Sequence, residues 1–147
     1  MSVVLGYDES PGAARALRIA IEVAAAYGEP LVLVYGAAPP GPTGEEYRAA
    51  YDAVRQAGRS GLERALAAAG EAGVPATVEV IDRAPAQALI EAAARHGGRV
   101  IVVGSWGESP IRGALLGSTP HKLLHLSTVP VLCVPTEAET EEAATGE

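Results

Sequence analysis

The 147-residue chain contains no phenylalanine, one tryptophan and one cysteine, although 48% of its residues are hydrophobic. Alanine and valine supply much of that hydrophobicity, so we expect a core of small side chains packed between helices and a sheet. The single cysteine, Cys133, excludes an internal disulfide framework. It falls in the last apolar run, where a thiol usually acts as a small buried hydrophobic side chain.

Basic residues are outnumbered, with 11 Lys and Arg against 18 Asp and Glu and a formal net charge of −7. This balance argues against nucleic acid as a partner, because affinity for nucleic acid depends on basic side chains that neutralise phosphates. It argues equally against anionic membrane surfaces. No apolar run is long enough to span a bilayer, and no charged segment followed by an apolar one opens the chain, so we expect a cytoplasmic protein.

Five apolar runs alternate with helix-like segments along the chain. The runs predict strands over residues 3–7, 31–35, 74–81, 100–103 and 129–134. The segments between them predict helices over residues 11–27, 45–69, 85–96 and 119–126, with Ser10 as the first N-cap, Gly28 and Gly97 as stops, and Leu62 and Leu66 on a buried side. Strands that alternate with helices favour one α/β domain with a parallel sheet over residues 1–135. Residues 136–147 are small and acidic, which predicts a disordered tail.

The most informative stretch lies between the last two predicted strands. An apolar run ends at Gly104, Gly107 follows after two residues, and after nine more come Gly117 and Ser118. Glycines let the backbone approach closely and supply unusual backbone angles. Ser118 and Thr119 stand where a helix begins, so free N–H groups and the helix dipole would face an anion there. The pattern therefore predicts a phosphate-binding loop; the alternative is ordinary loop glycines and residues that only cap the helix.

The spacing G-x-x-G-x(9)-G-S resembles the nucleotide-binding signature of the universal stress protein family. The opening VVLGYDESPGAARALRIAIEVAAAYGEPLVLVYG is similar to that family's first strand, helix and second strand, with the acidic Asp8 just past the first strand. The resemblance covers residues 2–135 and implies a single open five-stranded sheet of order 3-2-1-4-5 with helices on both faces. It also implies ATP as ligand, with Mg²⁺ or Mn²⁺, in a stress-response or signalling protein.

Strand order 3-2-1-4-5 makes the first and fourth strands neighbours, and ligands bind beyond the carboxyl ends of strands at such a switch point. Asp8 would then accept hydrogen bonds from a ribose or base, or position a divalent cation; alternatively it is an acid that favours the dipole of the first helix. The resemblance further implies that Gly6 and Gly36 line an adenine pocket and that Val103 contacts the nucleotide.

Two residues depart from the family pattern, because Trp106 and Glu108 stand where basic or hydrogen-bonding residues are common. A carboxylate beside phosphates is repulsive unless it bends away or shares a metal. An alternative hypothesis is therefore an interaction module of the same fold that binds no nucleotide. The loop has neither a P-loop lysine nor an evident catalytic base, so we expect slow ATP hydrolysis at most.

The last predicted strand, from Val129 to Val134, is short and apolar, and an exposed edge of this kind invites pairing with another chain. The resemblance implies a homodimer in which this strand pairs antiparallel with its symmetry mate; the alternative is that flanking prolines and the acidic tail block the edge. On the preceding helix, His121 and His125 are four residues apart. They lack the glutamate of H-E-x-x-H and an obvious third ligand, so we expect them to face solvent or a partner rather than a metal.

Overall fold

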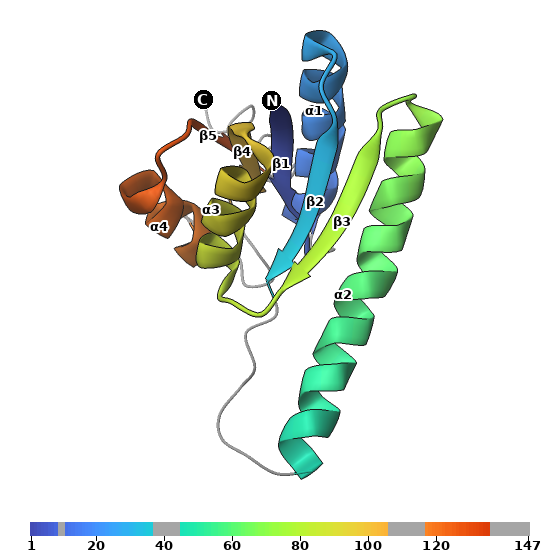
Figure 1. Cartoon of the computed structure of the whole chain (residues 1–147), viewed down its shortest axis with the longest axis vertical. Helices are drawn as coiled ribbons and strands as arrows, with labels where there is room; N and C mark the ends of the chain where they lie inside the picture. The colour runs from blue at the N-terminus through green and yellow to red at the C-terminus, as the bar shows by residue number, and fades with distance from the viewer. Residues whose placement is uncertain (9–10, 37–44, 106–116, 136–147) are drawn as a thin grey trace, which may run out of the picture.

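The computed structural model of the protein describes residues 1–8, 11–36, 45–105 and 117–135. Within these ranges, five strands alternate with four helices (Figure 1). The elements are β1 (Ser2–Gly6), α1 (Pro11–Tyr27), β2 (Leu31–Gly36), α2 (Glu45–Glu71), β3 (Ala76–Ile81), α3 (Pro85–His96), β4 (Gly98–Gly104), α4 (Ser118–Leu126) and β5 (Val131–Val134). The predicted N-cap Ser10, the segment 37–44 and the tail 136–147 lie outside the described residues.

The strands form one parallel sheet of order β3-β2-β1-β4-β5, which confirms the expected fold. The central strand β1 pairs with β2 on one side and with β4 on the other, so that Val3 lies between Leu31 and Val100. The chain runs outward from β1 through β2 to β3 and then returns across the sheet to β4. The carboxyl ends of β1 and β4 therefore flank the switch point.

Each face of the sheet is covered by two helices (Figure 1). Alternate residues of one strand point to opposite faces, so Val3 and Leu5 join the cluster with α1 and α2, while Val4 joins the cluster with α3 and α4. All three side chains are fully buried. The helices meet the sheet largely through alanines, which agrees with the expected core of small side chains.

Two strands begin later than the sequence pattern predicts. β3 starts at Ala76 rather than at residue 74, and β5 starts at Val131 rather than at residue 129. Pro75 and Pro130 precede these strands and have no N–H to donate to a ladder. Their carbonyl oxygens still accept hydrogen bonds from the neighbouring strands, at 2.8 and 2.9 Å.

The predicted helix stops are confirmed, because Gly28 and Gly97 adopt positive φ values of 66° and 61° at the ends of α1 and α3. The predicted buried side of α2 is wrong at one position. Leu62 is fully buried, whereas Leu66 is 37% exposed. The stripe continues instead through Ala65 and Ala69, three and seven residues after Leu62. Among the described helices, none combines the length and the apolar composition needed to cross a membrane.

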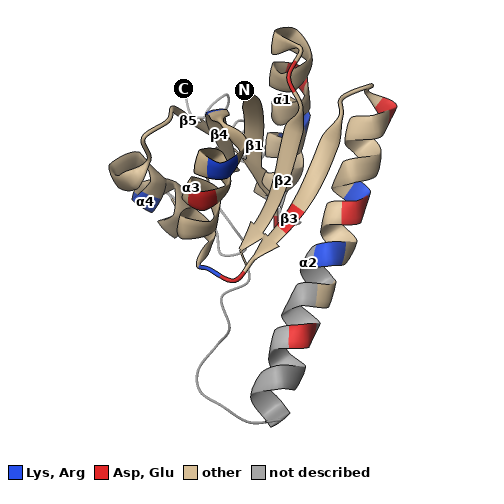
Figure 2. Cartoon of the chain, viewed as in Figure 1, with Lys and Arg blue, Asp and Glu red and all other residues tan. Residues whose placement is uncertain are grey.

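Charged side chains gather on the helices and near the strand ends (Figure 2). At the amino edge of the sheet, the Arg99 guanidinium donates hydrogen bonds of 2.6–2.9 Å to the Glu29 carboxylate. It also lies over the Tyr27 ring, 4.3 Å from the centroid. The hydrogen bonds from Arg99 hold the pKa of the Glu29 carboxyl below its usual value. This ion pair ties the start of β4 to the turn before β2, at the end of the sheet opposite the site described next.

Candidate functional site

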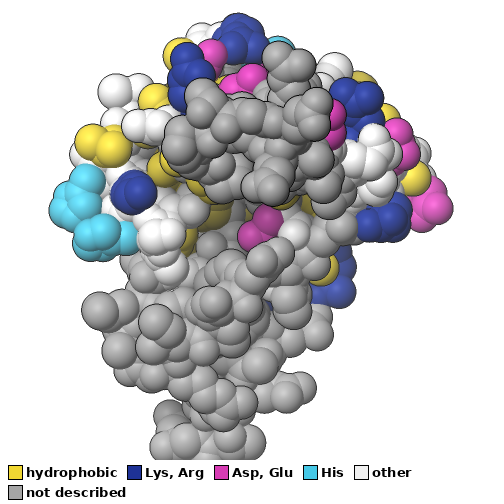
Figure 3. All heavy atoms as spheres, turned by 90° about the horizontal axis from the view of Figure 1, so that it is seen from below, with side chains coloured by type: hydrophobic (Ala, Val, Ile, Leu, Met, Phe, Trp, Pro, Cys, Tyr) yellow, Lys and Arg dark blue, Asp and Glu magenta, His cyan; other side chains and the backbone are white. Residues whose placement is uncertain are grey.

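A cleft of about 130 Å³ opens at the carboxyl edge of the sheet, beyond the ends of β1 and β4. Seen from that edge, it is a hollow with hydrophobic side chains and an acidic one inside (Figure 3). Eight of the nine predicted binding residues line it: Gly6, Asp8, Gly36, Val103, Gly104, Gly117, Ser118 and Thr119. The ninth, Gly107, lies outside the described residues, as do Trp106 and Glu108.

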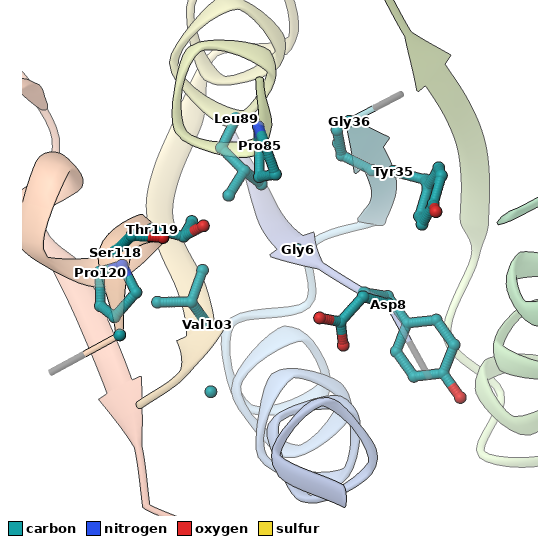
Figure 4. Close-up of a pocket in the computed structure, with 14 residues that line it drawn as sticks. Gly6, Asp8, Tyr35, Gly36, Pro85, Leu89, Val103, Ser118, Thr119 and Pro120 are labelled. Carbon is teal, nitrogen blue, oxygen red and sulfur yellow. The ribbon is translucent and has the colours of Figure 1, made fainter. Parts of the chain in front are cut away.

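One side of the cleft is an apolar slot. Leu89 and Pro85 reach it from α3, and Val103 reaches it from β4 (Figure 4). The sequence analysis named Val103 but missed the two residues of α3. The available signal was their position: Pro85 opens the helix that directly follows β3, so the first turn of that helix must lie at the same edge as the other strand ends.

Two glycines of the cleft are required by packing between neighbouring elements. A Cβ atom on Gly36 would lie 2.7 Å from the Pro85 Cα and 3.0 Å from the Arg83 carbonyl oxygen, so no side chain fits where β2 ends against the start of α3. A Cβ atom on Gly6 would lie 2.9 Å from a Leu89 methyl group, which is the mobile end of a side chain. The restriction at Gly36 is therefore the stricter of the two.

Gly104 is fixed in the same way by the first turn of α1. A Cβ atom there would lie 2.9 Å from the carbonyl carbon of Gly12 and 3.0 Å from its oxygen. Neither Gly104 nor Gly117 adopts a positive φ, and the φ of Gly117 is −55°. The expectation that these two glycines supply unusual backbone angles is therefore wrong, and close approach is the reason that remains for Gly104.

The first turn of α4 forms the polar end of the cleft. Gly117 is the N-cap residue, and no side chain caps the helix, so the interpretation of Ser118 and Thr119 as caps is wrong. The Gly117 N–H donates to the Ser105 carbonyl at 2.8 Å, which anchors the turn to the end of β4. Ser118 and Thr119 are the first two helical residues, whose N–H groups have no acceptor within the helix. Pro120, the third, has no N–H at all.

Asp8 faces this end of the cleft from the other side. It lies two residues past β1 and is exposed, and its carboxylate points into the same space as the Thr119 hydroxyl (Figure 4). It is the only carboxylate among the described lining residues. Its neighbour Tyr7 donates its backbone N–H to the Val34 carbonyl at 3.1 Å, and partial burial raises the pKa of the Tyr7 phenol.

The model of the universal stress protein family matches residues 1–135. The chain belongs to the universal stress protein family. Universal stress protein YxiE of Bacillus subtilis is 41% identical over 81 residues, which span 55% of this chain and 55% of that relative, so the match covers about half of the curated protein.

Solved universal stress proteins share the fold along nearly the whole chain. One in complex with cAMP is 31% identical, with a TM-score of 0.69 over 93% of this chain and 98% of its own. The protein from Archaeoglobus fulgidus in complex with dAMP is 23% identical, with a TM-score of 0.70 over 91% and 97%. The second likeness shows the fold alone, and the first also supports the family.

The outer strand of this universal stress protein differs in one respect from expectation. β5 is the last strand of the sheet and pairs with β4 on one side only. Cys133 is therefore half-buried rather than buried, and Leu132 is 37% exposed. Partial burial raises the pKa of the Cys133 thiol. Among the described residues, no cluster of three His, Cys, Asp or Glu side chains could hold a metal ion.

Proposed function

We propose that this universal stress protein binds ATP in the cleft and acts as a nucleotide-dependent dimer in a cytoplasmic stress response. The observation that carries the proposal is convergence. Asp8, Val103 and Thr119 are distant in sequence, yet they line one cleft at the switch point of the sheet. A cleft with an apolar slot and a few polar groups is typical of small-molecule sites.

The parts of an adenine nucleotide match the parts of the cleft. The apolar slot of Leu89, Pro85 and Val103 suits a flat base, and the N–H groups that open α4 suit phosphate oxygens. Asp8 would accept hydrogen bonds from the ribose between them. The 31% identical relative in complex with cAMP supports an adenine nucleotide as the ligand class.

A divalent cation fits this scheme through the ligand rather than through a protein cage. Mg²⁺ or Mn²⁺ would bind phosphate oxygens and keep several waters, with Asp8 as the nearest carboxylate of the described lining. The cation would offset repulsion between the triphosphate and a chain of net charge −7. Asp8 would serve as a cation or ribose partner, which leaves no separate general base among the described lining residues, so we expect slow hydrolysis at most.

Titration calorimetry of the nucleotide-stripped protein with ATP, with and without Mg²⁺, tests the binding proposal. We expect micromolar binding that weakens roughly tenfold or more in Asp8→Asn, because a hydrogen bond to a charged group contributes about 1.5–3 kcal/mol. Glu22→Gln, which removes a carboxylate from the exposed side of α1, is the matched control and should bind as the wild type does.

The competing hypothesis is an interaction module of the same fold without a nucleotide. It gains support from Gly36 and Gly104, because packing requires these glycines whether or not a ligand binds. Gly117→Val separates the two hypotheses: it should abolish ATP affinity under the first and change only stability under the second. No heat and no thermal shift at millimolar ATP in the wild type would establish the module.

The dimer would form by antiparallel pairing of β5 with its copy, which removes two open sheet edges together. Leu132 is the exposed apolar side chain at the centre of this strand. We expect a dimer at micromolar concentration in analytical ultracentrifugation and a shift toward monomer in Leu132→Glu. A monomeric wild type would overturn this part of the proposal and leave nucleotide binding untouched.

A further inference from the structure

The outer face of α4 carries two histidines that are close in space. His121 and His125 are both exposed, and residues four apart on a helix lie one above the other. Their ring centroids are 4.9 Å apart, and the ring planes meet at 74°. Histidine side chains gather at the edge of the molecule where α4 lies, away from the cleft (Figure 3).

This separation matches what one metal ion requires of two imidazoles. A Zn–N bond of about 2.0–2.1 Å places each ring centroid roughly 3.2 Å from the ion, so two rings on a tetrahedral ion have centroids roughly 5 Å apart. The observed 4.9 Å meets this condition without movement of the helix backbone. Rotation of exposed side chains is sufficient to aim a nitrogen of each ring at the ion.

We propose that His121 and His125 form a two-point site for a divalent transition metal ion, namely Zn²⁺, Ni²⁺ or Cu²⁺, with water in the remaining positions. Imidazole suits these ions, whereas Mg²⁺ prefers oxygen ligands. The site is thereby chemically distinct from the cation expected at the nucleotide phosphates. Absence of a third protein ligand in the described part of the chain leaves open coordination positions.

The charges around the pair decide how strongly a cation is attracted. The net charge of −7 favours cations in general. Lys122 adjoins His121 in the sequence and opposes them locally, but its exposed ammonium is screened by solvent and salt. The third histidine, His96, lies on α3 with its Nε2 atom 3.0 Å from a Glu79 carboxylate oxygen. It is therefore the competing place for a metal in this chain.

Titration of the untagged, nucleotide-free protein with ZnCl₂ tests the site, with MgCl₂ as the comparison salt. We expect His125→Gln to weaken zinc binding at least ~10-fold, because the second ring binds intramolecularly once the first is attached. The matched control is the double variant His125→Gln with Leu126→His. It keeps three histidines, and Leu126 is 58% exposed, but its second ring is five residues from His121 and leaves the shared face.

The outcomes separate the possibilities clearly. Weak zinc binding in both variants, with thermal melting unchanged, would support the site. Zinc binding unchanged in His125→Gln would overturn it and assign the metal to His96 and Glu79. Equal affinity in the double variant would reduce the effect to the number of histidines, and wild-type affinity no higher for Zn²⁺ than for Mg²⁺ would also refute the proposal. Nitrogen hyperfine structure from two imidazoles in the spectrum of the Cu²⁺ form provides a readout that involves neither ATP nor dimerisation.

Discussion

Substitution of Gly104 by alanine tests whether this residue serves the ligand or the fold. The added methyl group would lie 2.9–3.2 Å from three backbone atoms of Gly12. Backbone atoms cannot rotate away as a side chain can, so the first turn of α1 must move relative to β4. This contact joins the central part of the sheet to the helix that packs on it, and relief by local adjustment is therefore limited.

The magnitude follows from the cost of overpacking, which is about 1–3 kcal/mol for an extra methyl group in a well-packed site. Domains of this kind unfold with a free energy of about 5–15 kcal/mol, so the variant should fold but be measurably weaker. With a urea dependence of about 1–3 kcal/mol per molar, the midpoint should fall by roughly 1 M. ATP affinity measured on the folded variant should fall much less than in Gly117→Val.

Urea unfolding followed by circular dichroism provides the measurement, and Gly70→Ala provides the matched control. Gly70 is exposed in α2, and a Cβ atom there would meet nothing within 4 Å. Alanine at that position should raise stability by about 0.5–1 kcal/mol, because glycine is a poor helix former. A Gly104→Ala protein as stable as the wild type that no longer binds ATP would refute the packing argument and assign the glycine to the ligand.

Three further perturbations follow from the described contacts. Leu123→Ala removes a fully buried side chain of α4 and should lower the free energy of unfolding in urea by about 2–5 kcal/mol. Glu29→Gln should destabilise at pH 7: because the folded pKa of Glu29 lies below its usual 4.5, the stabilisation is present above that pH and is lost as the pH falls through the folded value. Urea titrations of both proteins from pH 7 to pH 3 should therefore converge. The Cys133 thiol should react with a thiol reagent at pH 8 more slowly than a free cysteine peptide, and unfolding should remove the difference.

Each of these expectations has a contrary result. A Leu123→Ala protein with an unchanged urea midpoint would mean that α4 is not held by this side chain. A pH-independent gap between the Glu29→Gln variant and the wild type would show that Arg99 does not act through the charge of the carboxylate. Equal reaction rates for the folded protein and the peptide would contradict the partial burial of Cys133.

The order of the elements could be predicted from the sequence, because each buried strand is a short apolar run and each helix has a periodic stripe. The strand order came from the family resemblance, since alternation alone does not specify it. The strand starts were predicted too early at Pro75 and Pro130, where an apolar run continues through a residue that cannot donate to the ladder. Leu66 was misplaced because alanines, which give a weak periodic signal, occupy the buried stripe of α2.

The candidate site was predicted in its residues and less well in its reasons. Spacing pointed to Gly104, but the atom that excludes a side chain there belongs to Gly12, far away in the sequence. Such a reason depends on how α1 settles on the sheet, which no local pattern reveals. Leu89 was missed for a similar cause, because an apolar residue in a helix looks the same whether it faces the core or a cleft.

The shortest helix is held by very little. Of the nine residues of α4, Pro120 and Leu123 are buried, while its exposed leucines and both histidines face outward. Few buried contacts make a segment one of the first to open locally while the rest of a domain stays folded. Its amides should therefore exchange with deuterium sooner than those of α3, in which five residues are buried. An anion held at the first turn of α4 and a metal ion clamped across its outer face would both slow that exchange, so the opening of one small helix would report on two separate ligands.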